Sequence, residues 1–265
     1  MIKTINSGQL LNMKKLLLVG FFGVSSFFAT AQSEGEEKPM NFSVNLNSDA
    51  FFGFYPSFGG SYSISDKIDF TTYGILWSGG VGGGWGNWTE FGLGVNIKPI
   101  EALSINPQIG ILNGSLLSNS FSSAGASQSS VVADGIVPNL TVRESTDKTE
   151  GEFYLGYYKG FKHESEFTNN YLHWWINGGF KATKFLSFGL HFEHLRFLGD
   201  IDEAANRPTA YDFYMVVGPY LQLSDPKGKA FTRFTACGDL RSDEEKVKAN
   251  YSNSSFFKLT VGYNF

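Results

Sequence analysis

Residues 254–265, SSFFKLTVGYNF, decide how the rest of the chain is interpreted. Every second side chain is apolar, namely Phe257, Leu259, Val261, Tyr263 and Phe265, and small or polar residues lie between them. Successive side chains of a β-strand point to opposite faces, so this stretch predicts a strand with one apolar face and one polar face.

The same alternation recurs from residue 41 onward. It predicts twelve strands, at residues 41–54, 57–65, 67–77, 89–98, 103–113, 135–145, 149–162, 170–183, 185–197, 209–223, 229–240 and 254–265. Alternation is weakest near residues 114–145, so a ten-stranded count is the alternative. Short links such as SDK (65–67) follow the even-numbered strands, and longer links such as SGGVGGGWGN (78–87) follow the odd-numbered ones.

Composition and strand length favour an all-β membrane barrel. Aromatic residues are 16 % of the chain, and no stretch after residue 31 approaches the roughly 20 apolar residues that a membrane helix needs. Several predicted strands have the length of about 9–11 residues that crosses a bilayer, whereas strands of soluble sandwiches are shorter. We therefore predict a transmembrane antiparallel up-and-down β-barrel, with a soluble sandwich as the alternative.

One face of the predicted strands is apolar and is expected to contact lipid. The clearest examples are Phe91, Leu93, Val95, Ile97, Leu103, Ile105, Ile109, Ile111, Leu172, Trp174, Ile176, Phe180, Leu186, Phe188, Leu190 and Phe192. An apolar face that is continuous over so many strands indicates a lipid-facing band.

The first 31 residues have the pattern of a cleaved export signal. Lys14 and Lys15 precede an apolar run at residues 16–28, and Ala-Thr-Ala at 29–31 precedes the predicted cleavage before Gln32. The sequence therefore predicts export across the inner membrane of a Gram-negative bacterium.

The predicted division of the chain is a signal peptide at 1–31, a short periplasmic tether at 32–40 and an outer-membrane barrel at 41–265. A start at Met13, with residues 1–12 mis-assigned, is an alternative. The signal holds three lysines and no acidic residue, so its removal changes the formal net charge from −4 to −7. Nucleic-acid partners need a basic surface, so we expect none.

The alternating aromatic C-terminus, Phe257, Leu259, Val261, Tyr263 and Phe265, resembles the C-terminal signal of Gram-negative outer-membrane β-barrel proteins. The resemblance implies recognition by the barrel-assembly machinery and closure of the barrel by pairing of the last strand with the first. A second resemblance lies in DGIVPNLTV (134–142) and EGEFYLGYYKG (150–160), which look like a group of uncharacterised, porin-like outer-membrane barrels. It implies no specific activity.

The opposite face of the strands is polar and predicts the lining of the interior. Its candidates are Glu90, Asn106, Gln108, Arg143, Glu152, Tyr154, Tyr158, His173, Trp175, Asn177, Lys181, His191, Glu193, Asp212, Tyr214, Arg233 and Lys258. Twelve strands enclose a space between filled eight-stranded and open sixteen-stranded barrels. We therefore predict a passive or weakly selective channel for small polar solutes, and the alternative is a structural or surface-interaction barrel whose lumen is plugged by side chains and which transports nothing.

A predicted turn near residues 183–184 brings His173, His191 and Glu193 together and places Trp175 opposite Glu193. Two histidines and a carboxylate are ligands of the kind zinc takes, but no fourth ligand is evident. We expect hydrogen-bonded wall residues here, with no metal and no cofactor.

Other motifs do not support catalysis. HESE (163–166) has no glycine-framed serine, and GGVGGGWG (79–86) lacks the Lys-Ser/Thr and the helix of a phosphate-binding loop, so we expect no enzyme. His194 and Arg196 share the lipid face and are candidates for contact with lipopolysaccharide phosphates. The expected partners are outer-membrane lipid, lipopolysaccharide and the assembly machinery, and the expected state is a monomer.

Overall fold

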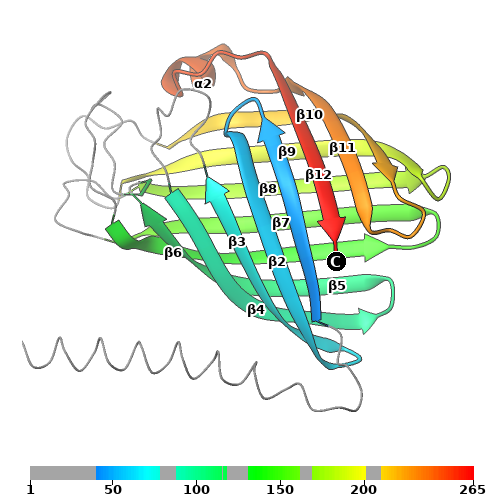
Figure 1. Ribbon diagram of the computed structural model, residues 1–265. Coiled ribbons are helices and arrows are strands. Elements are labelled where there is room, and N and C mark those ends of the chain that lie inside the picture. The colour runs from blue at the N-terminus through cyan, green and yellow to red at the C-terminus, as the bar shows by residue number, and fades with distance from the viewer. Residues whose placement is uncertain (1–39, 78–87, 115, 118–130, 162–168, 201–209) are drawn as a thin grey trace, which may run out of the picture. The chain divides into compact units, whose positions relative to one another are not determined.

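The computed structural model describes residues 40–77, 88–114, 116–117, 131–161, 169–200 and 210–265. Met40–Phe265 forms one compact unit, in which twelve antiparallel strands close into a barrel (Figure 1). The strands are β1 (Met40–Asp49), β2 (Gly53–Ser65), β3 (Ile68–Trp77), β4 (Trp88–Ile100), β5 (Leu103–Gly114), β6 (Val131–Ser145), β7 (Thr149–Gly160), β8 (Asn169–Lys181), β9 (Leu186–Asp200), β10 (Tyr211–Ser224), β11 (Ala230–Asp239) and β12 (Ser255–Asn264). The predicted barrel with twelve strands is confirmed, and the ten-stranded and sandwich alternatives are wrong.

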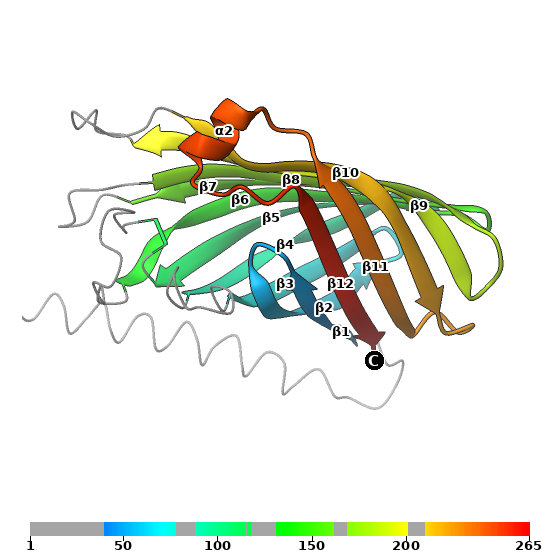
Figure 2. The ribbon, with the colours of Figure 1, turned by 90° about the horizontal axis from the view of Figure 1, so that it is seen from above.

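Each strand pairs with the next strand in the chain, and β12 pairs with β1 to close the cylinder. The closing register runs from Ser43 opposite Asn264 to Asp49 opposite Lys258. Figure 2 shows β12 and β1 side by side at this seam. The Phe265 N–H donates to the Phe42 carbonyl at 2.8 Å, so backbone pairing extends to the last residue.

The two ends of the barrel differ in their connections. The five short turns, at residues 66–67, 101–102, 146–148, 182–185 and 225–229, lie at the end that also holds Met40 and Phe265, which we call the turn end. We call the opposite end the loop end. It carries α2 (Asp243–Lys248), which lies between β11 and β12 in sequence (Figure 1). Among the described residues, no helix has the length and apolarity to cross a bilayer.

The first hairpin departs from the prediction. Residues 41–54 were expected to form one strand, but β1 ends at Asp49 and a turn at residues 50–52 leads into β2. The Asp49 carboxylate accepts hydrogen bonds from the N–H groups of Phe51 at 2.8 Å and Phe52 at 2.5 Å, a side-chain interaction that favours a turn over extended backbone. Gly53 follows with a φ of 70°, which glycine adopts without steric cost.

Near residues 114–145, where the alternation is weakest, strand pairing extends further than predicted. The long link was placed at residues 114–134, but β6 begins at Val131, opposite Gly114 of β5. Leu117 is buried, and its N–H donates to the Asp134 carboxylate at 2.6 Å. The predictions for the signal peptide, for the tether up to residue 39, and for the loops at 79–86 and 163–166 lie outside the described residues.

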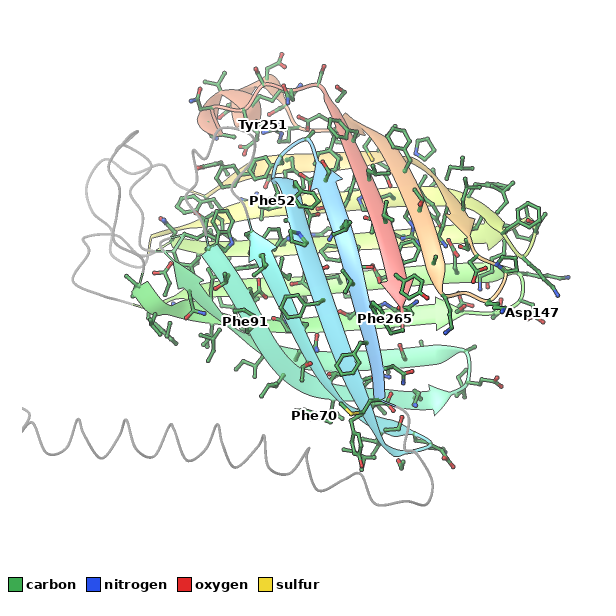
Figure 3. The ribbon with its side chains drawn as sticks, in the orientation of Figure 1. Phe52, Phe70, Phe91, Asp147, Tyr251 and Phe265 are labelled. Carbon is green, nitrogen blue, oxygen red and sulfur yellow. The ribbon has the colours of Figure 1, made fainter. Side chains whose placement is uncertain are left out.

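The outer surface of the barrel is apolar, as the alternation predicted. On β4, Phe91, Leu93, Val95 and Ile97 are exposed, and the residues between them face inward or are glycine. Figure 3 marks Phe91 on this outer side. On β12 the side chains of the C-terminal pattern are exposed in the same way, from Phe257 to Phe265. Such a surface is stable where the surrounding medium is hydrocarbon rather than water.

Candidate functional site

The interior of the barrel contains a polar cavity of about 850 Å³. Its lining begins at the turn end, with residues such as Asn41 and Asn264, and extends inward to Tyr55, Trp77 and His173. The lining side chains come from all twelve strands, because inward-facing positions alternate with outward-facing ones along each strand. We call this space the polar cavity.

Twelve of the seventeen predicted interior residues line the polar cavity. They are Asn106, Gln108, Arg143, Glu152, Tyr154, Tyr158, His173, Trp175, Asn177, His191, Arg233 and Lys258. Glu90, Glu193 and Tyr214 are fully buried beyond it. Lys181 lies at the turn end, where its Nζ donates to Ser145 Oγ and the Thr146 carbonyl, each at 2.7 Å.

One wall of the cavity is built around Glu152 on β7. Its carboxylate accepts from Arg143 Nε at 2.7 Å and from Trp175 Nε1 at 2.9 Å. The Trp175 ring stacks on Tyr154, with centroids 4.0 Å apart and an interplanar angle of 17°. This wall therefore presents a fixed aromatic surface beside a paired charge.

A second polar group lies around Glu150, which has the same strand parity as Glu152. Its Oε1 accepts from Tyr220 OH at 2.8 Å and from Ser187 Oγ at 3.0 Å, and lies 3.5 Å from Arg233 Nη2. The Arg233 guanidinium also lies over the Tyr220 ring at 4.6 Å. These contacts join β7, β9, β10 and β11 across the lumen, so they brace the wall at the turn end.

Glu193 lies at the inner end of the polar cavity and is fully buried. Its Oε1 is 2.9 Å from His173 Nε2 and accepts from Tyr214 OH at 2.8 Å. Its Oε2 is 2.9 Å from His191 Nε2 and accepts from Lys258 Nζ at 2.8 Å. One carboxylate thus joins β8, β9, β10 and β12.

The predicted grouping of His173, His191 and Glu193 is therefore present, with Trp175 opposite Glu193 in the strand register. Both histidines bond to the carboxylate, and His191 Nδ1 also bonds to Asn177 Oδ1. Across the described ranges, no set of three or more His, Cys, Asp or Glu side chains is arranged to hold a metal ion.

Glu90 forms a second buried carboxylate centre. It accepts from Tyr73 OH at 2.6 Å and from Trp77 Nε1 at 3.3 Å. Tyr73 OH in turn accepts from Asn139 Nδ2 at 2.8 Å, which links β3 to β6. The donors to this carboxylate are neutral, in contrast to the ammonium on Glu193.

The loop half of the lumen is filled by aromatic rings. Phe52 contacts Trp77 on β3 at a centroid distance of 4.7 Å and Tyr214 on β10 at 6.5 Å. Phe51 contacts Phe213 at 5.5 Å and Tyr214 at 5.0 Å. Because β3 and β10 lie on different sides of the barrel, the two phenylalanines bridge the lumen. We call these five residues the aromatic plug.

The turn that carries the aromatic plug is held in place at the loop end. Tyr251 packs edge-on against Phe51 at 5.2 Å, and its hydroxyl lies 3.4 Å from the Ala50 carbonyl. Figure 3 shows Tyr251 beneath α2 and Phe52 at the loop ends of β1 and β2. A small apolar cavity of about 30 Å³ remains between the plug and neighbouring rings such as Trp88.

Asp212 does not line the interior, contrary to the prediction. A β-bulge in β10 between Asp212 and Tyr214 inserts one residue, so the side chains before it lie on the opposite face from the one that the alternation predicts. Asp212 Oδ1 instead lies 2.6 Å from Arg196 Nη1 and 2.9 Å from His194 Nε2, the two residues assigned to the outer face.

Sequence reasoning missed the most decisive interior residues, Phe51 and Phe52, because it placed them inside a continuous strand. A signal for them was present: Asp49 followed by Gly53 is typical of a tight turn. Glu150 was also missed, although it shares the parity of Glu152, because it lies at the start of its strand.

Comparison with known proteins places the chain in a family. The model of a family of unknown function (DUF6733) matches residues 11–265, which confirms the resemblance to an uncharacterised group. No curated protein matches the chain.

Among solved structures, a KdgM porin shares 14 % identity at a TM-score of 0.42, covering 84 % of this chain and 99 % of that chain. A NanC porin shares 11 % identity at a TM-score of 0.45, covering 86 % of this chain and 99 % of that chain. LpxR from Salmonella typhimurium shares 8 % identity at a TM-score of 0.42, covering 84 % of this chain and 99 % of that chain. These similarities concern the barrel fold alone.

Proposed function

Since the chain belongs to DUF6733, a family of unknown function, we propose its role from the geometry of the barrel: it passes small polar solutes through a gated lumen in the outer membrane. The polar cavity is the vestibule of this passage, and the aromatic plug is its gate. The single observation that carries the proposal is a polar space of about 850 Å³ separated from the loop end by a plug whose two bridging rings, Phe51 and Phe52, come from one three-residue turn.

The proposed setting follows from the surface of the barrel. The exposed apolar residues contact lipid, the turn end faces the periplasm and the loop end faces outward, as in outer-membrane barrels with short periplasmic turns. The chain reaches this membrane by means of its cleaved leader, residues 1–31, and the barrel-assembly machinery recognises the C-terminal pattern. We propose a monomer, because the cylinder pairs all of its own strand edges.

Contact with lipopolysaccharide is part of the same proposal. Arg196 has 38 % of its side chain exposed, but Asp212 neutralises part of its charge. The affinity for lipopolysaccharide should therefore fall only modestly in an Arg196→Ala variant. An unchanged affinity would remove this contact from the proposal.

Ring contacts, rather than strand pairing, hold the gate closed. The plug residues Phe51 and Phe52 belong to a short turn rather than to the paired wall, so their displacement breaks ring contacts and few backbone hydrogen bonds. Aromatic contacts contribute about 0.5–1.5 kcal/mol each beyond area burial. Phe51 and Phe52 make several such contacts, so the closed gate is favoured by several kcal/mol and openings should be rare.

The second candidate is a structural barrel that conducts nothing. The observation that favours it is the packing of the loop half, where Tyr214 and Trp88 are almost fully buried. In this alternative the polar cavity is a water-filled recess that ends at the plug.

Single-channel conductance in planar bilayers separates the two candidates. We expect the wild type to show rare, brief openings, and the Phe51→Ala/Phe52→Ala variant to show long openings of larger conductance. Phe91→Ala is the matched control, because it removes the same type of side chain from the outer face and should behave as the wild type does. If the double variant inserts and stays silent, the barrel is structural. If the wild type and the double variant conduct equally, the plug is not a gate.

A further inference from the structure

We propose that the inner end of the polar cavity is a binding site for primary ammonium groups, and that small amines are the solutes that the cavity admits. In the structure, the side chain of Lys258 fills this site with its own ammonium group. Admission of amines as solutes rests on the proposed function, whereas the ammonium site itself does not.

The site has two recognition elements that suit an ammonium ion. Lys258 Nζ donates to Glu193 Oε2 at 2.8 Å and lies 5.0 Å from the centroid of the Trp175 ring. A carboxylate and an aromatic face together bind cations through charge and through the ring quadrupole. Trp175 is held for this role by its stacking on Tyr154 and its hydrogen bond to Glu152.

The geometry of Glu193 selects a compact donor. Its Oε1 already has His173 and Tyr214 as partners, and its Oε2 has His191, so one acceptor position remains for the ammonium. A guanidinium binds a carboxylate best through two parallel hydrogen bonds, which this arrangement does not offer. An anion cannot take the place of the ammonium on Glu193, because it repels the carboxylate and offers it no hydrogen-bond donor.

The site is reachable from the polar cavity. Glu193 is fully buried, but Lys258 has 16 % of its side chain exposed and lines the cavity together with Trp175. A solute that enters from the turn end therefore meets the ammonium of Lys258 before it meets the carboxylate. When the ammonium of a solute replaces that of Lys258, Glu193 remains paired with a cation. The exchange therefore avoids the large cost of an unpaired buried charge.

The charges around the route also favour cations. Among the described residues, the cavity lining together with the inner carboxylates Asp49, Glu90 and Glu193 holds seven carboxylates, the others being Asp69, Glu144, Glu150 and Glu152. The cations that face or pair with them are four, Lys98, Arg143, Arg233 and Lys258. Asp49 lies directly opposite Lys258 in the register of β1 and β12, so the inner end is the most acidic part of the route.

The test vacates the site and offers it a free ammonium ion. Lys258→Met removes the charge and shortens the side chain by one heavy atom, so the position of Nζ beside Glu193 becomes free while the stem keeps its wall contacts. We compare thermal unfolding of detergent-solubilised protein in methylammonium chloride and in tetramethylammonium chloride, which has the same charge but no N–H donor. Because a ligand stabilises the state that binds it, methylammonium should raise the Tm of this variant by about 3 °C more than tetramethylammonium does.

Two controls make the comparison specific. The wild type should discriminate between the two salts much less than Lys258→Met does, because the tethered ammonium of Lys258 competes for the site. The double variant Glu193→Gln/Lys258→Met should not discriminate, because the carboxylate is gone. Equal responses of Lys258→Met to both salts would overturn the proposal.

The proposal can also be tested if Lys258→Met fails to fold. If the variant does not fold in buffer, its refolding yield is measured in the same two salts, and rescue by methylammonium alone is expected. Rescue by neither salt, or by both equally, contradicts the ammonium site. This binding assay needs no open channel, so its outcome is independent of the conductance measurement that tests the gated passage.

For the solute class, the reversal potential of the Phe51→Ala/Phe52→Ala variant in a methylammonium acetate gradient should indicate cation preference. Preference for acetate would refute amines as solutes even if the ammonium site is present.

Discussion

Replacement of Glu193 by glutamine should destabilise the barrel more than any other isosteric change in its interior. The carboxylate has four bonded partners, two on each oxygen: Tyr214 OH, His173 Nε2, His191 Nε2 and Lys258 Nζ. A glutamine keeps one acceptor oxygen and replaces the other with an NH2 donor. Two of the four partners therefore lose their acceptor. The NH2 group of the glutamine then faces these two partners, which are themselves hydrogen-bond donors.

The expected magnitude follows from what the change leaves behind. Whichever way the amide turns, the positive charge of Lys258 has no carboxylate partner at this position, and loss of one partner of a buried ion pair costs about 3–5 kcal/mol. The exposure of Lys258, 16 % of its side chain, reduces the cost through hydration. We expect a loss of about 3 kcal/mol in the free energy of unfolding.

The matched control is Glu90→Gln. Glu90 is equally buried but accepts from the neutral donors Tyr73 OH and Trp77 Nε1, and a glutamine oxygen can keep one of the two. Its loss should be about 1–2 kcal/mol.

The assay is urea unfolding of the protein in lipid vesicles, followed by tryptophan fluorescence. The double variant Glu193→Gln/Lys258→Met should regain part of the loss, because the unpaired ammonium is removed with its partner. A Glu193→Gln protein that is as stable as Glu90→Gln, or a double variant that is less stable than the sum of its single changes, would refute the reasoning.

Three further outcomes are expected. Asp49→Ala removes the acceptor for the N–H groups of Phe51 and Phe52, so it should loosen the turn and destabilise the barrel by about 1–2 kcal/mol. The open time in bilayer recordings should increase, and an unchanged open time would contradict the role of the turn. Glu245 accepts from the Asp212 N–H, which holds the pKa of the Glu245 carboxyl below its usual value of 4.5. The stabilisation that this bond provides is present above pH 4.5 and is lost as the pH falls through the lowered pKa. The protection of the Asp212 amide, measured as its exchange rate relative to the intrinsic rate at the same pH, should therefore fall in that acidic range, and Glu245→Gln should abolish this fall. Removal of Phe265 should lower the yield of assembly by purified assembly machinery several-fold while the Tm of the folded protein changes little, because the Phe265 side chain is 67 % exposed; an equal loss of Tm and yield would indicate a structural role instead.

Much of the candidate site was predictable because strand periodicity places side chains without reference to the rest of the fold. Trp175 and Glu193 were expected opposite each other, and they are, since a short hairpin sets the register of its two strands. Asp212 was assigned to the wrong face because one inserted residue in β10 reverses the alternation, and a bulge leaves little trace in a local pattern.

The sequence by itself determined the strands and their division into an apolar outside and a polar inside, because a period of two residues is a local property of each strand. The closure of the barrel was implied by the resemblance of the C-terminal pattern to that of outer-membrane barrels. Only the tertiary structure decided whether the lumen is open. The plug depends on Phe51 and Phe52 reaching Trp77 and Tyr214, residues far apart in the chain that meet only after the cylinder has closed. The pairing of Lys258 with Glu193 across the interior was decided in the same way, since no local pattern specifies which charges face each other across a lumen.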